Sequence, residues 1–260
     1  MKHNLLLGAI IGDTIGSIYE FNPTKNYNFR LLDNRMEYTD DSIMTIAVAQ
    51  WMQSGKDKKS LIYYMQKWGR KYRYPMGSYG GMFSTWLDSD NPMPYNSWGN
   101  GSAMRVSPVG FYSKTLEETL NAARICAEVS HNHPEGIKGA QATAAAVFLA
   151  KNGKNKNDIK EYIASAFGYD LNRTCDEIRP DYCFEPSCQE TVPQSIIAFL
   201  DSNDFEDAIR LTISLGGDAD TMGAITGAIA AAFYKEIPDE MYDFVWNKLP
   251  QDMQDVINNR

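Results

Sequence analysis

The chain has 260 residues, of which 43% are hydrophobic and 22% are charged, enough for one large domain or two small ones with a substantial core. The formal net charge of −8 argues against a nucleic-acid-binding surface, because such a surface needs clustered lysine and arginine. The four cysteines form no C-x-x-C pair and are predicted to be free thiols in a reducing compartment. The apolar run over residues 5–11 is too short to cross a bilayer, so we expect a soluble, cytoplasmic protein without membrane contact.

The first periodic segment, residues 4–20, is predicted to be a largely apolar helix. Asp13 and Glu20 lie seven residues apart, so they would share a face of this helix and contribute to an acidic site. The alternative is that Asp13 caps a neighbouring element and Glu20 is solvated. Small residues at a spacing of four predict a flat stripe on which another helix can approach closely: Gly8, Gly12 and Gly16.

The next acidic motif is Thr39-Asp40-Asp41-Ser42, which precedes the apolar segment 43–52. A single acid at a helix N-terminus is often only a cap, since the helix dipole favours it there. Asp40 and Asp41 are adjacent and repel each other, so this pair would gain from a cation bound between them.

A helix over 60–74 is predicted to end at the break 75–81, and a loop rich in aromatic residues follows over 82–95. The motif Gly99-Asn100-Gly101-Ser102-Ala103-Met104-Arg105 comes next. It has neither the Walker A nor the dinucleotide-binding spacing. Its glycines could form an anion cradle, with backbone N–H groups directed outward and Arg105 as the counter-charge, although such a motif can also be an ordinary turn.

The second half of the chain continues the helical pattern. Thr115 to Glu118 fits a capping box, and Pro134 suits the first position of the helix that runs to Lys151. Between these helices, His131 and His133 could bind a transition metal, but the oxygen-rich motifs elsewhere favour a harder ion. We therefore expect one histidine to hydrogen-bond within the site and the other to lie in the loop. Further helices are predicted over 157–167, 193–200, 204–215, 238–249 and 250–258, with a long loop over 169–192.

The last acidic motif, Gly216-Gly217-Asp218-Ala219-Asp220-Thr221, opens an almost wholly apolar segment. Such a segment belongs in the interior, where two carboxylates are costly unless a cation neutralises them. Thr221 would add a neutral oxygen of the kind that hard cations prefer. No segment alternates with period two, so residues 1–260 are predicted to form one all-α domain, a compact orthogonal helical bundle. If the acidic helix ends converge, a central binuclear Mg²⁺ or Mn²⁺ site follows.

Taken together, these motifs resemble the ADP-ribosylglycohydrolase family, whose order they follow from residue 8 to residue 221. The resemblance implies that two divalent cations, Mg²⁺ or Mn²⁺, are held by Thr39, Asp40, Asp41, Asp218, Asp220 and Thr221. It implies that ADP-ribose lies across the metals, and that its binding residues are Asn100, Gly101, Ser102, Arg105 and His131. Glu20 corresponds to the family's acidic residue beside the scissile bond, and Glu20 and Asp41 are the expected catalytic residues.

The resemblance also implies the reaction: cleavage of the bond between the ribose C1 carbon and an acceptor side chain, which releases ADP-ribose. The acceptor favoured by the resemblance is arginine of a protein, while serine, a nucleobase or a small metabolite stays open. Two other classes of function are a metal-dependent phosphohydrolase and a non-catalytic ADP-ribose binder. Ser42 stands where the family commonly has threonine, and Tyr182 and Phe184 are the candidates for stacking on adenine.

Overall fold

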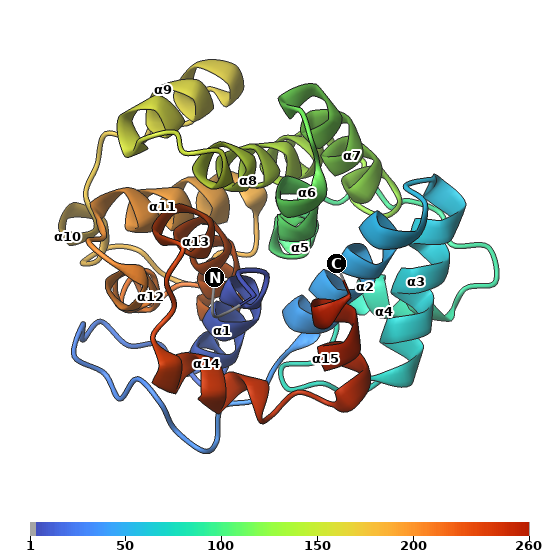
Figure 1. Ribbon diagram of the computed structural model, residues 1–260, viewed down its shortest axis with the longest axis horizontal. Helices are drawn as coiled ribbons and strands as arrows, with labels where there is room; N and C mark the ends of the chain where they lie inside the picture. Colours follow the sequence, from blue (N-terminus) through green and yellow to red (C-terminus); the bar gives the residue numbers. More distant parts are fainter. Residues whose placement is uncertain (1–3, 260) are drawn as a thin grey trace.

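The structure is a computed structural model, and it describes residues 4–259. The regular secondary structure of this part of the chain consists of helices without a strand, which confirms the predicted all-α class. Helix α13 (Ala219–Tyr234) packs against α1 (Leu7–Gly16), α8, α11 and α12, and Figure 1 shows α3, α4 and α15 on the other side of the molecule, near α2. The helices are α1 (Leu7–Gly16), α2 (Asp40–Ser54), α3 (Lys58–Lys71), α4 (Gly81–Asp88), α5 (Gly101–Met104), α6 (Ser107–Tyr112), α7 (Leu116–Glu128), α8 (Pro134–Lys151), α9 (Lys156–Phe167), α10 (Cys175–Ile178), α11 (Cys188–Asp201), α12 (Phe205–Ile213), α13 (Ala219–Tyr234), α14 (Asp239–Trp246) and α15 (Gln251–Asn258).

Several helix ends differ from the predicted ones. α1 ends at Gly16 rather than at residue 20, so Glu20 lies in a bend beyond the helix. α3 begins before Ser60, because the Asp57 side chain accepts hydrogen bonds from the backbone N–H groups of Lys59 and Ser60 and so caps the first turn. The shared helical face predicted for Asp13 and Glu20 is therefore wrong, and another feature must bring Glu20 to the site.

The predicted loop over 169–192 is also partly wrong. It contains α10, which opens with a capping box between Thr174 and Glu177, and the first turn of α11. The predicted helix start at Pro193 is wrong, because this proline lies inside α11, which begins at Cys188. A proline there removes one backbone hydrogen bond but does not end the helix, because the apolar side chains of α11 remain buried in the core.

The closest helix contact in the molecule joins α1 and α13, as the glycine stripe predicted. Gly8 meets Gly227, and Gly16 meets the backbone of Ala219. A Cβ atom on Gly12 would lie only 1.8 Å from the carbonyl oxygen of Gly223, so no larger residue fits. This contact fixes the C-terminal end of α1 beside the N-terminal end of α13, and the segment that follows α1 therefore reaches the last acidic motif.

Replacing Gly12 by alanine should destabilise the protein by about 3 kcal/mol, since an overpacked contact between two backbones has no flexible side chain that can move aside. Gly81→Ala is the matched control, because a Cβ atom there meets nothing within 4 Å and the residue opens a helix. Chemical denaturation measures both changes. A Gly12→Ala protein as stable as the wild type would contradict the backbone contact.

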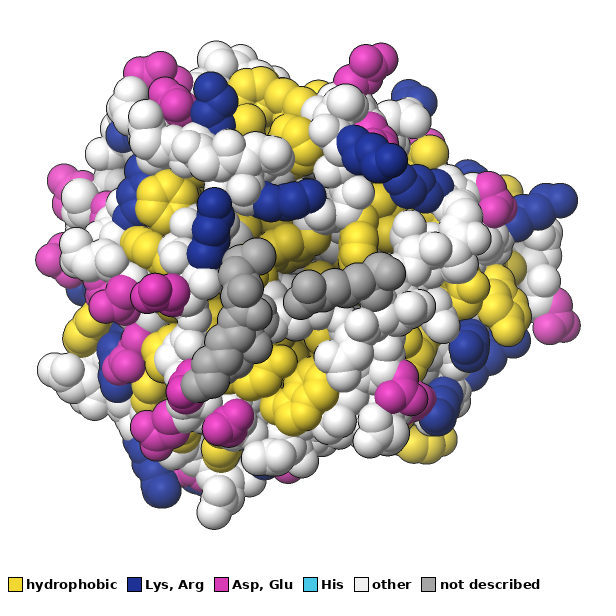
Figure 2. All heavy atoms as spheres, in the orientation of Figure 1, with side chains coloured by type: hydrophobic (Ala, Val, Ile, Leu, Met, Phe, Trp, Pro, Cys, Tyr) yellow, Lys and Arg dark blue, Asp and Glu magenta, His cyan; other side chains and the backbone are white. Residues whose placement is uncertain are grey.

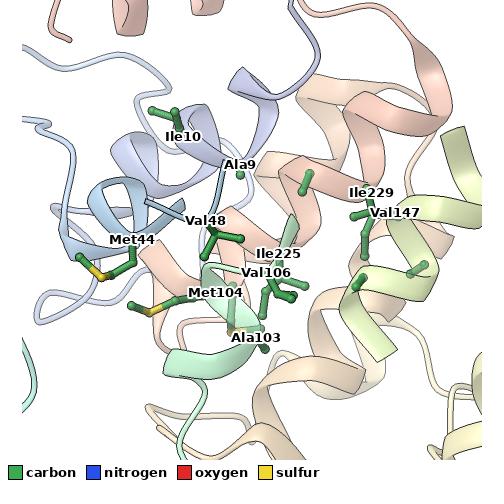
Figure 3. Packing of buried hydrophobic residues seen from close by; sticks show 14 of the residues in the cluster. Ala9, Ile10, Met44, Val48, Ala103, Met104, Val106, Val147, Ile225 and Ile229 are labelled. Atoms are coloured by element: carbon green, nitrogen blue, oxygen red, sulfur yellow. The ribbon is translucent and has the colours of Figure 1, made fainter. Parts of the chain in front are cut away.

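The hydrophobic core lies directly behind the acidic helix ends. Figure 3 shows Met44 and Val48 of α2 near Met104 of α5, and Ile225 of α13 beside them. All four side chains are buried. The buried cluster extends from Leu6 to Ile257, so both ends of the described chain contribute to the same core. This packing holds the first turns of α2 and α13 in place.

The surface carries charges of both signs. On the face shown in Figure 2, lysine and arginine side chains are interspersed with aspartate and glutamate, and hydrophobic side chains lie between them. Over residues 4–259, no helix combines the length and apolar character needed to cross a membrane.

Candidate active site

A cavity of about 630 Å³ lies where the predicted motifs meet. Its walls come from the N-terminal ends of α2 and α13, the bend after α1, and the loops that precede α4 and α5. Two predicted site residues, Thr39 and Ser102, are fully buried behind this wall. The other predicted residues line the cavity: Glu20, Asp40, Asp41, Asn100, Gly101, Arg105, His131, Asp218, Asp220 and Thr221.

Two of the acidic motifs open helices, and the N-terminal ends of these helices, α2 and α13, line the cavity. Thr39 is the N-cap of α2, and its hydroxyl accepts a hydrogen bond from the backbone N–H of Asp41 at 3.2 Å. Gly216 adopts a left-handed conformation with φ of +71°, which turns the chain between α12 and α13. Asp218 is then the N-cap of α13, and Asp220 lies in its first turn. Helix N-termini favour negative charge, so both ends suit carboxylates and anionic ligands.

Asp13 has a structural role behind the site. Its buried carboxylate accepts hydrogen bonds from the backbone N–H groups of Thr39, at 3.0 Å, and Ser42, at 3.1 Å. It also accepts from both hydroxyl groups, that of Thr39 at 2.7 Å. Burial raises its pKa to about 6, against the effect of these hydrogen bonds. The alternative in which Asp13 caps a neighbouring helix is therefore confirmed, and Ser42 supplies the hydroxyl that the cap needs.

Glu20 reaches the last acidic motif from the bend after α1. One carboxylate oxygen from each of Glu20, Asp218 and Asp220 lies within 4.8 Å of the other two, a spacing that could hold a metal ion. On its other side Glu20 contacts the backbone of Gly77, where a Cβ atom would lie 2.7 Å from Glu20 Oε2. Burial, with the nearby charges of Asp220 and Asp13, raises the pKa of Glu20 to about 8.

The other carboxylates of the cavity also lack nearby positive charge. Burial and mutual repulsion raise the pKa values of Asp40, Asp41 and Asp220 well above the usual range, and burial raises that of Asp218 to about 6. Asp41 Oδ1 is buried and has no hydrogen-bond partner in the described part of the chain. Among residues 4–259, no lysine or arginine forms an ion pair with any of these groups. The donor set therefore fits divalent cations, which would supply the missing positive charge.

Asn100 and Ser102 make internal contacts. The Asn100 amide donates to Asp218 Oδ2 at 2.7 Å and to Thr191 Oγ1 at 3.2 Å, so it orients one of the candidate metal ligands. The Ser102 hydroxyl donates to the carbonyl of Gly136 at 2.7 Å and faces α8 rather than the cavity. α5 begins directly after Asn100, with Gly101 at the cavity wall.

Arg105, His131 and His133 lie in three different environments, which the sequence predicted only in part. The Arg105 guanidinium is fully buried and donates to Ser130 Oγ and to the carbonyl of Cys126, while the residue also lines the cavity. His131 lines the cavity. His133 accepts from the Glu135 N–H and caps α8, which agrees with the expectation of one histidine in the site and one in the loop.

The aromatic residues at the mouth were largely missed. Phe184, a predicted adenine-stacking candidate, lines the cavity and stacks on Phe21 with ring centroids 6.3 Å apart. Tyr182, the other candidate, packs against Gly217 instead. Trp98 and Phe21 also line the cavity and are more than half exposed. No periodic pattern marks these loop residues, so only their aromatic character could have indicated them.

The comparisons with known proteins agree with this geometry. The model of the ADP-ribosylglycohydrolase family matches residues 3–259, so the chain belongs to this family. It is 28% identical to "ADP-ribosylarginine hydrolase Tri1" of Pseudomonas putida (strain GB-1), over 96% of this chain and 76% of that protein. It is 25% identical to the human "ADP-ribosylhydrolase ARH3", over 88% of this chain and 84% of that protein.

A solved structure, "ADP-ribosylglycohydrolase-related protein complex", has the same fold, with a TM-score of 0.74. Its sequence identity is 23%, and the match covers 98% of this chain and 95% of that one. The resemblance seen in the sequence motifs is therefore confirmed, and the chain is an enzyme of the glycohydrolase class.

Proposed function

We propose that this protein hydrolyses the glycosidic bond between ADP-ribose and an acceptor and releases ADP-ribose, with an arginine side chain of a protein as the acceptor. The observation that carries the proposal is the convergence of Glu20 with Asp218 and Asp220 at one cavity. A volume of about 630 Å³ lies in the range of small-molecule sites. Arginine is supported by the name of the Pseudomonas relative, an ADP-ribosylarginine hydrolase.

The acidic residues are proposed to hold two divalent cations, Mg²⁺ or Mn²⁺. Asp41 Oδ1, buried without a partner among the described residues, supports this assignment. When bound, such ions orient ribose hydroxyls and activate water. The proposed ligands are Thr39, Asp40, Asp41, Asp218, Asp220 and Thr221.

Glu20 is the proposed acid or base of the reaction. The bend after α1 brings its carboxylate to the cavity wall beside the carboxylates of Asp218 and Asp220, and Gly77 lies close to it on the other side. Burial and the neighbouring carboxylates raise the pKa of Glu20 to about 8 in the cation-free protein, and cations bound beside it would lower this pKa, so that the carboxyl group can exchange a proton with the reacting groups near neutral pH. Asp41 is the second proposed catalytic residue. Its backbone N–H donates to Thr39, and it lines the cavity.

The assignment of the acceptor is tested with a panel of substrates. Arginine-, serine- and nucleobase-linked ADP-ribose are incubated with the protein and either Mg²⁺ or Mn²⁺, and released ADP-ribose is measured. We expect the arginine linkage to be cleaved fastest. If another linkage were cleaved faster, its acceptor would take the place of arginine in the proposal. If no linkage were cleaved, the proposed activity would be contradicted.

Divalent cations should stabilise the protein in a pH-dependent way. Because the pKa of Glu20 is raised in the folded state, that state binds more protons than the unfolded chain between about pH 4.5 and pH 8, and the cation-free protein loses stability as the pH rises through this window. Cations bind the deprotonated carboxylates. Saturating Mg²⁺ should therefore raise Tm by about 5–10 °C at pH 8 and by less than half of that at pH 5.5. Scanning calorimetry measures both shifts, and equal shifts at the two pH values would contradict the site.

A further inference from the structure

A chain of three buried polar side chains ends at the cavity. Arg105 Nη2 donates to Ser130 Oγ at 2.8 Å, and Ser130 Oγ lies 2.8 Å from Nδ1 of His131. Arg105 and Ser130 are fully buried, and His131 is 5% exposed. The Arg105 guanidinium is held further by the carbonyl of Cys126 at 2.9 Å, so the position of this charge is fixed.

The direction of these hydrogen bonds follows from the chemistry of the groups. A guanidinium can only donate, so Ser130 Oγ accepts from Arg105. The Tyr95 hydroxyl also hydrogen-bonds to Ser130 and keeps its proton, so it can fill the second lone pair of the serine oxygen. The serine proton is then left for His131 Nδ1, while a proton on Nδ1 would point toward the positive charge of Arg105. The nearby positive charge of Arg105 stabilises a lone pair on Nδ1 and disfavours a proton there. Burial and the charge of Arg105 also hold the pKa of His131 well below its usual range, so the ring is neutral and carries its one proton on Nε2.

Turning the ring over would place Cδ2, which is not a hydrogen-bond acceptor, against Ser130 Oγ, so the contact between Ser130 and Nδ1 opposes this rotation. The Tyr95 ring packs on the imidazole, with centroids 5.4 Å apart and an interplanar angle of 60°. The Tyr95 backbone N–H also donates to the carbonyl of Ser130 at 3.0 Å, which ties this loop to the residue before His131. Tyr95 and Arg105 are the titratable groups that face the histidine, and burial raises the pKa of Tyr95 to about 12, so its hydroxyl stays protonated.

The other nitrogen of His131 faces the glycines of the cavity wall. A Cβ atom on Gly101 would lie 2.9 Å from Nε2, and one on Gly99 would lie 3.7 Å from it. Both glycines line the cavity, so the missing side chains leave Nε2 open to a ligand. Over residues 4–259, no hydrogen bond of the protein occupies Nε2.

We propose that Ser130, held by Arg105, is a positioning residue that fixes His131 in the Nε2–H tautomer and so presents a neutral hydrogen-bond donor to an oxygen atom of the bound ligand. The identity of the ligand as ADP-ribose rests on the proposed function, whereas the tautomer does not. Arg105 acts on the donor through Ser130, because its guanidinium donates to the same oxygen atom that hydrogen-bonds to His131.

The tautomer is measured directly by nitrogen NMR of the protein labelled with ¹⁵N-histidine, because protonated and unprotonated ring nitrogen atoms have well-separated shifts. The His131→Gln variant identifies the His131 signals, and His133→Gln is the matched control. We expect Nε2 of His131 to be protonated and Nδ1 to be unprotonated between pH 6 and pH 8. A protonated Nδ1 would overturn the proposal, whether or not ADP-ribose binds.

A double-mutant cycle tests the role of Ser130, with ADP-ribose binding in Mg²⁺ measured by calorimetry. Ser130→Ala should weaken binding about tenfold, as expected for one well-placed hydrogen bond. Glutamine carries an N–H donor near the Nε2 position and needs no partner to set its tautomer. His131→Gln should therefore bind within about threefold of the wild type, and adding Ser130→Ala to it should change binding less than twofold. If Ser130→Ala weakened ADP-ribose binding tenfold in the His131→Gln protein as well, Ser130 would have only a structural role and the proposal would be overturned.

Discussion

Replacing Asp220 by asparagine should abolish the response of the protein to divalent cations and lower turnover at least about 100-fold, because changes to groups that only support metal ligands already cost 10- to 100-fold. In the cation-free protein, the same change should raise the melting temperature at pH 8. Burial and the charge of Asp218 raise the pKa of Asp220 well above the usual range, so its ionised form is unfavourable in the fold. Activity assays and calorimetry with and without Mg²⁺ measure the two effects.

Asp13→Asn is the informative control for this prediction. Asp13 is equally buried, but its carboxylate accepts hydrogen bonds from Thr39 and Ser42, and an amide can accept at only one of its two atoms. We expect a loss of about 2 kcal/mol of stability with or without Mg²⁺. If Asp220→Asn destabilised the cation-free protein as Asp13→Asn should, Asp220 would be a structural residue and the cation site would be contradicted.

Glu20→Gln should lower the rate by about 10²- to 10⁴-fold, the usual contribution of a general acid or base, while ADP-ribose still binds. Glutamine has nearly the same shape and fits the space between Gly77 and the carboxylates of Asp218 and Asp220. Single-turnover kinetics and ADP-ribose titration separate the rate from binding.

The matched control is Glu37→Gln, a half-exposed carboxylate in the segment between α1 and α2, paired with Lys248 at 3.1 Å. It should leave both the rate and the binding unchanged. Full activity of Glu20→Gln would remove Glu20 from the chemistry, and loss of ADP-ribose binding would make it a ligand-binding group instead.

Much of the fold could be predicted from local patterns. The spacing of Gly8, Gly12 and Gly16 predicted a close helix contact, and the partner proved to be α13. Thr115 marked the start of α7 correctly, since capping depends on neighbours in the sequence. Pro193 was misread because whether a helix continues through proline depends on its tertiary packing, which no short pattern contains.

The candidate site could be predicted where its chemical groups are close together in the sequence. Asp40 with Asp41, and Asp218 with Asp220, are costly pairs in any buried setting, and all four line one cavity. The arrangement of the supporting groups was not predictable. Arg105 contacts Ser130, 25 residues away, and no local rule distinguishes this buried guanidinium from one that faces a phosphate.

The acidic motif at the start of α13 was predicted, but the way in which Glu20 comes to lie beside it was not. A continuous helix over 4–20 would have placed Glu20 through its periodicity, whereas the observed bend places it through the contact between Gly16 and Ala219. The contact of Gly77 with Glu20 is likewise tertiary, although its φ of +78° explains why glycine stands at that position.

The most direct test of the account is product analysis of arginine-linked ADP-ribose treated with this protein, in Mg²⁺ and in excess chelator. Hydrolysis at the ribose C1 carbon with bound cations predicts intact ADP-ribose as the product in Mg²⁺ and no product in chelator. Release of AMP would assign the cavity to a phosphohydrolase, and undiminished ADP-ribose release in chelator would contradict a cation-dependent site.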